Sequence, residues 1–397
     1  MNDVTRQFRD FFVSMKLTVV LLALGLILIF AATLDQVNLG IWAVQEKYFR
    51  SFFVLVRFGD IPVPVFPGGY FIGGLLLFNL IAAHVSRFKL TWRKAGIQLT
   101  HTGLILLLLG ELLSGLWQED FQMRIEEGET KNYSESFRLN ELAITDTNDA
   151  KFDDVVAIPE SLLERSEPLQ HPKLPFRVVV KAYYPNAELV RRTADGPPAP
   201  ATTGIGLNVT ALPHAPTYAP DERNTPAAYV ELVGTDKSLG TWLVFISPNA
   251  QPSFPQHFDY AGHSWKIVLR PSRAYKPFAL TLLKFTHDVY AGTEVIRDGK
   301  IVDEGIPKNF ASRLRLTSPD GHDDREVLIY MNNPLRYAGL TFYQASYDGA
   351  HTTVLQVVRN PSWLLPYIAC ALMALGLVWQ FGFHLVAFIG KRRPAVA

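Results

Sequence analysis

The sequence contains one cysteine, Cys370, among 397 residues. A single cysteine leaves the chain without an internal disulfide, a CxxC motif or a CxxCH motif, so it is neither a thiol oxidoreductase nor a c-type cytochrome. An excess of charge is also lacking, because 38 Lys and Arg stand against 37 Asp and Glu. Nucleic acid binding needs a concentrated basic face, and this balance gives no support to a nucleic acid partner.

Long apolar runs, in contrast, are abundant. Three lie before residue 120 and one lies near the C-terminus, and Glu111 is the one charge among them. A helix that spans a bilayer needs about 20 mostly apolar residues. Transmembrane helices are therefore predicted over residues 17–34, 70–86, 97–117 and 362–390. The first run is followed by Asp35-Gln36-Val37-Asn38 rather than by a small-x-small cleavage site, so it is predicted to be a permanent helix.

The positions of Lys and Arg orient these helices, since basic short segments stay in the cytoplasm. Three segments that share one side of the membrane hold Arg6, Arg9, Lys16, Arg87, Lys89, Arg93, Lys94, Lys391, Arg392 and Arg393. We therefore expect a multi-pass protein of the cytoplasmic (inner) membrane, with tails 1–16 and 391–397 and loop 87–96 in the cytoplasm. Residues 35–69 and 118–361 are then extracytoplasmic, on the periplasmic side.

The first extracytoplasmic loop, residues 35–69, mixes two patterns. Residues 41–58 combine aromatic side chains with Glu46, Lys47, Arg50 and Arg57, which predicts a helix lying in the membrane interface. The proline spacing in residues 60–67 excludes a helix there.

The large extracytoplasmic segment carries the pattern of strands. β-branched and aromatic runs with partial alternation occur at 176–184, 206–212, 228–233, 241–246, 265–269, 279–285, 313–316, 327–331, 340–346 and 353–358. Strands that follow one another without intervening helices favour antiparallel sheets. The predicted fold class is an integral membrane α-helical protein with four transmembrane helices plus a large all-β domain, built as an antiparallel sandwich or open barrel.

Four ionisable side chains lie inside the predicted spans: His84, His101, His384 and Glu111. Such residues are costly in a bilayer and are therefore candidates for function. His101 lies about two helical turns beyond Lys94, roughly 10 Å deep, and His84 lies nearer the interface. An imidazole in a span suits an axial ligand to haem iron or another metal. It equally suits hydrogen bonding to headgroups, water or a neighbouring helix, and Glu111 suits either a proton path or an interfacial carboxylate.

Three stretches have more distinctive sequences: residues 94–110, KAGIQLTHTGLILLLLG; residues 123–133, MRIEEGETKNY; and residues 330–348, YMNNPLRYAGLTFYQASYD. They resemble, in that order, the third span, the start of the outer domain and the closing signature of the ResB (CcsB) family of cytochrome c biogenesis proteins. The order of three spans, outer domain and final span is similar too. The chain departs from the family in reading Ala32-Thr33-Leu34-Asp35-Gln36 where many members have a Gly-Thr … Ile-Pro-Gln stretch.

The resemblance implies a function. ResB proteins pair with a CcsA-type membrane protein to carry haem outward and attach it to CxxCH cysteines of apocytochrome c. By this likeness His101 is a haem axial ligand, with b-type haem in transit and the other ligand on the partner, and His84 is the second candidate. The chain is then a subunit of a cytochrome c synthase, without a self-contained catalytic site. The alternative is a haem-free scaffold protein whose β domain docks partner proteins.

The 330–348 segment also suits a purely structural role. Asn333-Pro334 and Gly339 are turn residues, and the segment otherwise has the composition of a strand. Its function is therefore left open by the sequence.

Overall fold

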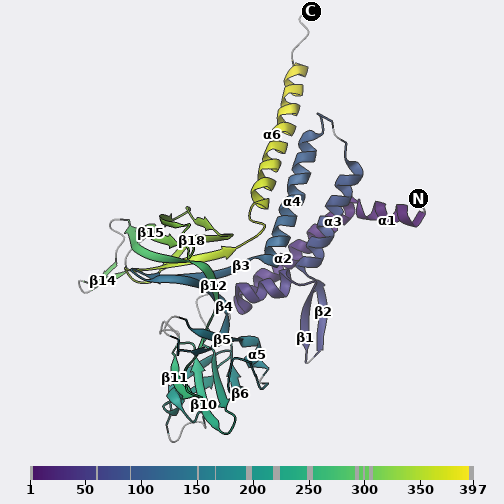
Figure 1. The fold of residues 1–397 in the computed structure, drawn as a ribbon. Coiled ribbons are helices and arrows are strands. Elements are labelled where there is room, and N and C mark those ends of the chain that lie inside the picture. Colours follow the sequence, from purple (N-terminus) through teal and green to yellow (C-terminus); the bar gives the residue numbers. More distant parts are fainter. Residues whose placement is uncertain are drawn as a thin grey trace, which may run out of the picture. The chain divides into compact units, whose positions relative to one another are not determined.

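The computed structural model describes residues 3–392, except 60, 90, 150–151, 166, 194–198, 218–223, 248–253, 291–294, 298–299 and 304–306. Residues 393–397 of the predicted C-terminal tail therefore lie outside the described residues. The chain divides into two compact units (Figure 1). A helical unit holds the described residues up to Glu119 and from Asn360 onward, and a β-rich unit holds those from Asp120 to Arg359.

The helical unit confirms the predicted four-helix membrane class. Its elements are α1 (Asp3–Phe12), α2 (Met15–Val44), the π-helical turn η1 (Gln45–Phe49), β1 (Phe53–Phe58), β2 (Ile61–Pro67), α3 (Gly69–Arg87), α4 (Ala95–Trp117) and α6 (Leu365–Arg392). Within the described part of the chain, four segments are long and apolar enough to cross a membrane: Met15–Phe49, Gly69–Arg87, Ala95–Trp117 and Leu365–Ile389.

The first helix does not end at residue 34, where the predicted span ends. Helix α2 continues through Asp35 to Val44, with a kink at Gly40, whose φ is 69°. Beyond the kink the chain folds back, so that Lys47 Nζ lies 2.6 Å from Asp35 Oδ2. The hydroxyl of Tyr48 donates to the same carboxylate oxygen. Because Asp35 has these partners, its charge is accommodated within the helix.

The interfacial helix predicted over residues 41–58 is wrong in its second half. Helical structure ends at Phe49, and β1 pairs with β2 in an antiparallel hairpin. Valine and phenylalanine favour extended structure, and the prolines of β2 are tolerated in an edge strand. The charges of Glu46, Lys47 and Arg50 therefore belong to the helical turn, and Arg57 belongs to the hairpin.

The β-rich unit contains antiparallel ladders, as predicted. Its elements are β3 (Glu119–Glu126), β4 (Thr130–Asp146), β5 (Asp154–Pro159), α5 (Glu160–Glu164), β6 (Arg177–Tyr184), β7 (Ala187–Arg191), η2 (Gly204–Leu207), β8 (Val209–Pro213), β9 (Ala227–Val233), β10 (Ser238–Phe245), β11 (Gln256–Tyr260), β12 (His263–Val289), β13 (Val295–Arg297), β14 (Lys300–Asp303), β15 (Pro307–Thr317), β16 (Asp324–Tyr330), β17 (Leu335–Tyr337), β18 (Leu340–Tyr347) and β19 (Thr352–Arg359). A ten-stranded sheet has β16-β15-β12-β4-β3-β19-β18-β17 as its main path, and β16 also lies against β17 and β18. The ends of this sheet approach each other, so it resembles a nearly closed barrel.

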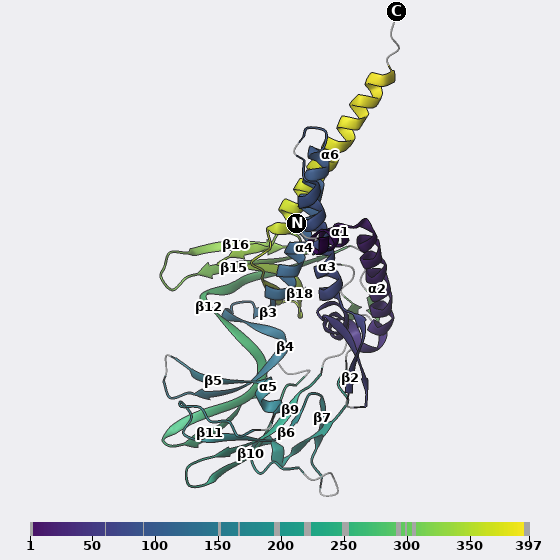
Figure 2. The ribbon, with the colours of Figure 1, turned by 90° about the vertical axis from the view of Figure 1, so that its right-hand side faces the viewer.

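The two long strands β4 and β12 run through both halves of this unit (Figure 2). The sequence pattern suggests two strands at 265–269 and 279–285, whereas the structure has one strand with register shifts after Pro271 and Tyr275. One core packs around Leu142, Val230 and Leu269, and the other packs around Leu280, Leu314 and Phe342, all fully buried. Burying each such side chain contributes about 1.5–3 kcal/mol.

Charged side chains occupy the stretch of β4 and β12 between the two cores. Arg270 Nη2 lies 2.9 Å from Glu141 Oε1, and each side chain is 8% exposed. Ser272 donates a hydrogen bond to the other oxygen of Glu141. Farther along, Arg273 pairs with Glu135 and its guanidinium lies 4.0 Å from the centre of the Tyr133 ring. These pairs neutralise the buried charges at the point where one core ends and the other begins.

Candidate functional site

Two of the candidate histidines lie side by side on neighbouring helices. His84 is in the last turn of α3 and His101 is in the second turn of α4. The centroids of their rings are 6.2 Å apart and the ring planes differ by 27°. Both side chains are half-buried. The sequence nominates these residues separately, and the fold brings them together.

The hydrogen bond of His101 determines which ring nitrogen is available. Its Nδ1 lies 2.8 Å from the carbonyl oxygen of Ile97, one turn earlier in α4. A carbonyl oxygen only accepts, so Nδ1 carries the proton and Nε2 of the neutral ring keeps its lone pair. A backbone bond to the remote nitrogen is a common way to orient a metal-binding imidazole.

Helix α4 is held in place by a close contact with α6. Gly96, Gly103 and Gly110 recur every seven residues along α4. A Cβ at Gly96 would lie 2.7 Å from the carbonyl oxygen of Gly376, and one at Gly103 would lie 2.6 Å from Met373 Cγ. At about 100° per residue, His101 is on the opposite side of α4 from this glycine row. The packing with α6 therefore turns His101 toward α3. The heptad spacing of the glycines is the sequence signal for this packing.

The other two candidates from the spans do not join the pair of histidines. His384 accepts a hydrogen bond at Nε2 from Gln380 Nε2, 2.7 Å away on its own helix, and contacts the ring of Phe383. Glu111 is exposed on the surface of α4, almost three turns beyond His101. The ring contact thus joins His84 and His101, whereas the hydrogen bond of His384 is made within α6.

The imidazoles of His84 and His101 suit a metal ion that is already coordinated by a cofactor and needs few ligands from protein. Within the described residues, no three His, Cys, Asp or Glu side chains cluster in a way that could hold a metal ion. A tetrahedral zinc site needs three or four protein ligands, whereas a porphyrin iron takes only one or two axial ligands from protein. An open Nε2 on His101 with a second imidazole nearby fits the second requirement.

The 330–348 segment has a structural role in the core around Leu280, Leu314 and Phe342. Gln344 Oε1 accepts from Ser312 Oγ at 2.6 Å, and Gln344 Nε2 donates to Thr353 Oγ1 at 2.9 Å. Ser312 and Thr353 are both fully buried. Asn332 and Ala338 adopt positive φ angles of 63° and 48° in the turns that flank β17. The segment therefore closes the sheet and satisfies a buried polar network.

The 123–133 segment also has contacts that stabilise the fold. Glu127 accepts a hydrogen bond from the backbone N–H of Phe285 at 2.7 Å and pairs with His351 Nδ1 at 2.9 Å. The hydrogen bond from the backbone N–H of Phe285 is the main reason that the pKa of the Glu127 carboxyl is lowered, and His351 adds to the effect. This turn ties β3 and β4 to β12 and to the turn before β19.

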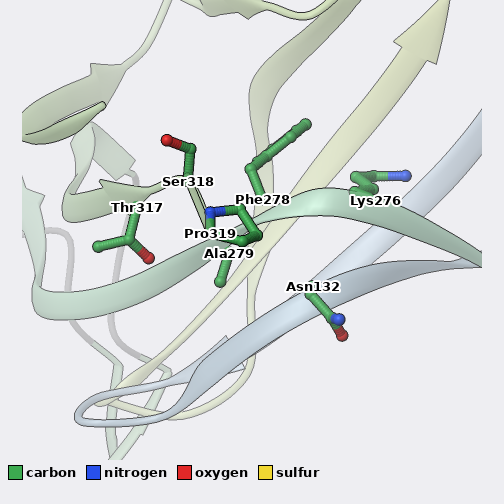
Figure 3. A pocket seen from close by; sticks show the side chains of 7 residues that line it. All are labelled: Asn132, Lys276, Phe278, Ala279, Thr317, Ser318 and Pro319. Carbon is green, nitrogen blue, oxygen red and sulfur yellow. The ribbon is translucent and has the colours of Figure 1, made fainter. Parts of the chain in front are cut away.

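A pocket of about 180 Å³ lies in the half of the β-rich unit that holds the core around Leu280, Leu314 and Phe342 (Figure 3). It is lined by Asn132, Lys276, Phe278, Ala279, Thr317, Ser318 and Pro319. The ammonium group of Lys276 points away from the Thr317 side of the pocket and donates to Ser134 Oγ at 2.8 Å. None of the lining side chains is an imidazole, thiol or carboxylate, so the pocket offers no metal ligand of those types.

Comparison with known proteins matches parts of the chain. The model of the ResB-like family matches residues 262–353, which include the 330–348 segment. Protein NrfI of Wolinella succinogenes is 32% identical over 115 residues, 29% of this chain and 12% of that protein. Cytochrome c biogenesis protein CcsB of Synechococcus sp. (strain WH7803) is 44% identical over 62 residues, 16% of this chain and 14% of that protein. CcsB of Crocosphaera subtropica is 34% identical over 76 residues, covering 19% and 17%. The aligned segments thus span a small part of each relative.

Proposed function

We propose that this chain, which belongs to the ResB/CcsB family of cytochrome c biogenesis proteins, handles haem in the membrane through His101. The observation that carries the proposal is the Nδ1 bond of His101 to Ile97, which leaves Nε2 open. Bound haem would supply iron that is already held by four ring nitrogens and has axial positions to fill. The role of His101 is to bind that iron through Nε2.

The residues around His101 orient it for this role. The carbonyl oxygen of Ile97 holds the ring in one tautomer, and the contact of Gly103 with α6 fixes the helix that carries it. His84, with its ring centroid 6.2 Å away, is proposed as a secondary ligand. A CcsA-type membrane protein is proposed to supply the other axial ligand in the working complex, as the family resemblance implies.

The proposed orientation follows from charge. Arg87 ends α3, Lys89, Arg93 and Lys94 lie in the connection between α3 and α4, and basic connections favour the cytoplasmic side. The ends of these helices that carry His84 and His101 would then face the cytoplasm of a bacterial inner membrane. The β-rich unit would be periplasmic, where it would receive apocytochrome c for haem attachment.

The test is an absorption spectrum of the purified complex of this chain with its CcsA-type partner. We expect a Soret band in the parent complex, a loss or shift of that band in His101→Ala, and a smaller change in His84→Ala. His384→Ala is the matched control, because this histidine lies in a span but bonds within its own helix. Resonance Raman spectra of the iron–imidazole mode give a second readout that does not depend on cytochrome c synthesis.

Two outcomes would contradict the proposal. An unchanged spectrum in an intact His101→Ala complex would remove His101 as the ligand. A parent complex that is intact but contains no haem would favour the alternative function, a membrane-tethered scaffold whose β domain docks partner proteins.

A further inference from the structure

The N-terminal helix α1 is separated from α2 by a break that α3 holds in place. Asn79, which is 2% exposed, donates from Nδ2 to the carbonyl oxygens of Phe12 at 2.6 Å and Ser14 at 3.3 Å. Its Oδ1 accepts a hydrogen bond from Thr18 at 2.7 Å. The guanidinium of Arg87 donates to the carbonyl oxygen of Val13, which lies between Phe12 and Ser14. The break is therefore a fixed bend, because its free backbone carbonyls are satisfied by side chains.

The bend turns α1 away from the axis of α2, as both views show (Figures 1 and 2). Only Val13 and Ser14 separate α1 from a helix that is apolar enough to span a membrane. A ten-residue helix attached to a span in this way must leave the helical unit close to the bilayer surface. The fixed bend therefore determines where α1 lies as well as its direction.

The exposed side chains of α1 divide into two faces. Phe8 and Phe11 are 65% and 56% exposed and, three residues apart, share one face. Phe12, at the edge of this face, packs edge-on against Phe78 of α3. Arg6 and Arg9 are exposed on the opposite face. A short helix with bulky apolar residues on one face and arginines on the other has the composition of a membrane-surface helix.

We propose that α1 is a lipid-binding helix that lies flat in the headgroup layer, with Phe8 and Phe11 immersed and Arg6 and Arg9 toward anionic phosphates. Charge complementarity supports an anionic phospholipid, since Lys16 and Arg87 join Arg6 and Arg9 to give four cations on α1 and around the bend, against the two aspartates of α1, Asp3 and Asp10, of which Asp10 pairs with Arg9. This surface is independent of the proposed haem ligand. Asn79 joins α3 to the bend and not to this surface.

The experiment uses the full-length protein in vesicles of phosphatidylcholine and phosphatidylglycerol. In a Cys370→Ser background, a bimane fluorophore is attached at Phe8→Cys or, on the opposite face, at Asp10→Cys. We expect brominated lipid to quench position 8 about threefold more strongly than position 10, and aqueous iodide to do the reverse. Equal iodide quenching at both positions would overturn the proposal, because α1 would stand in water. Protection of position 8 from both quenchers would overturn it too, because protein would cover the helix.

The preference for anionic lipid has a separate readout. Energy transfer from position 10 to an acceptor on phosphatidylglycerol should be about twofold higher than transfer to the same acceptor on phosphatidylcholine. The double variant Arg6→Gln/Arg9→Gln should lose this difference while position 8 stays immersed. Equal transfer to both lipids in the parent protein would contradict the anionic preference.

Discussion

Gly103 of α4 lies so close to Ala369 of α6 that a Cβ at position 103 would be 2.7 Å from the carbonyl oxygen of Ala369. Backbone carbonyls cannot move away from such a contact without moving the helix. The close approach therefore sets the distance between α4 and α6 and, with it, the direction in which His101 points.

A larger residue at position 103 should separate the two helices. We expect Gly103→Leu to destabilise the helical unit by about 1–3 kcal/mol, as overpacking does in other well-packed cores. The measurement is thermal unfolding of the purified protein in detergent, together with tryptophan fluorescence, because Trp92 stacks on Trp379 of α6 at 5.2 Å.

Gly382→Ala is the matched control for this change. Gly382 lies on α6 with nothing within 4 Å of a Cβ, so alanine should be neutral or slightly stabilising there. Equal losses of stability in both variants would show that the helices tolerate no glycine replacement at all, and the argument from close contact would fail.

The class of fold could be predicted from the sequence, whereas several element boundaries could not. Long uncharged runs have few alternatives to membrane helices, and alternating β-branched runs have few alternatives to strands. The continuity of β12 was missed because Pro271 and Pro277 interrupt its pattern, while its pairing with β4 carries the strand past them. The hairpin of β1 and β2 was missed because pairing between two short segments is a tertiary contact that propensity does not reveal.

The candidate site shows the same division. The depth of His101 in an apolar run singled it out from the sequence. Its 6.2 Å separation from His84 was not predictable, because the distance between side chains on two helices depends on how those helices pack. The resemblance to the family singled out the 330–348 segment but did not show whether its residues serve function or structure. The structure shows that Gln344 of this segment is part of a buried hydrogen-bond network.

Gln344 should be important for stability of the β-rich unit. Gln344→Leu removes the acceptor of Ser312 Oγ and the donor to Thr353 Oγ1 in a buried environment. We expect a loss of about 1–3 kcal/mol, because buried hydroxyls lose hydrogen-bond partners. Denaturant unfolding followed by circular dichroism measures the change. Gln356→Leu, on the adjacent strand β19, is the control and should have a much smaller effect; if it costs as much, the network is not the cause.

The Glu127 carboxyl should make the β-rich unit sensitive to acid. Its folded pKa is lowered, chiefly by the N–H of Phe285 and further by His351, so its stabilising contribution is fully present above the pKa of the unfolded chain. That contribution is lost as pH falls through the lower folded pKa. Melting temperatures measured between neutral and acidic pH should therefore fall less steeply in Glu127→Gln than in the parent. Glu167→Gln, at an exposed position of the same unit, should leave the slope unchanged, and a parallel shift in all three proteins would refute the assignment.

Breaking the buried pair between Glu141 and Arg270 should strongly destabilise the β-rich unit, whereas replacing both residues by apolar ones should destabilise it much less. Glu141→Leu leaves the Arg270 guanidinium without its carboxylate partner at a position where both side chains are 8% exposed, and we expect a loss of about 3–5 kcal/mol. The double variant Glu141→Leu/Arg270→Met removes both charges and leaves apolar side chains between the two cores. It should regain most of that loss, because neither variant side chain then requires a charged partner. A double-mutant cycle by denaturant unfolding gives the coupling. If the double variant is as unstable as Glu141→Leu, the pair does more than neutralise itself, and the junction of β4 and β12 needs these charges to hold the two cores in register.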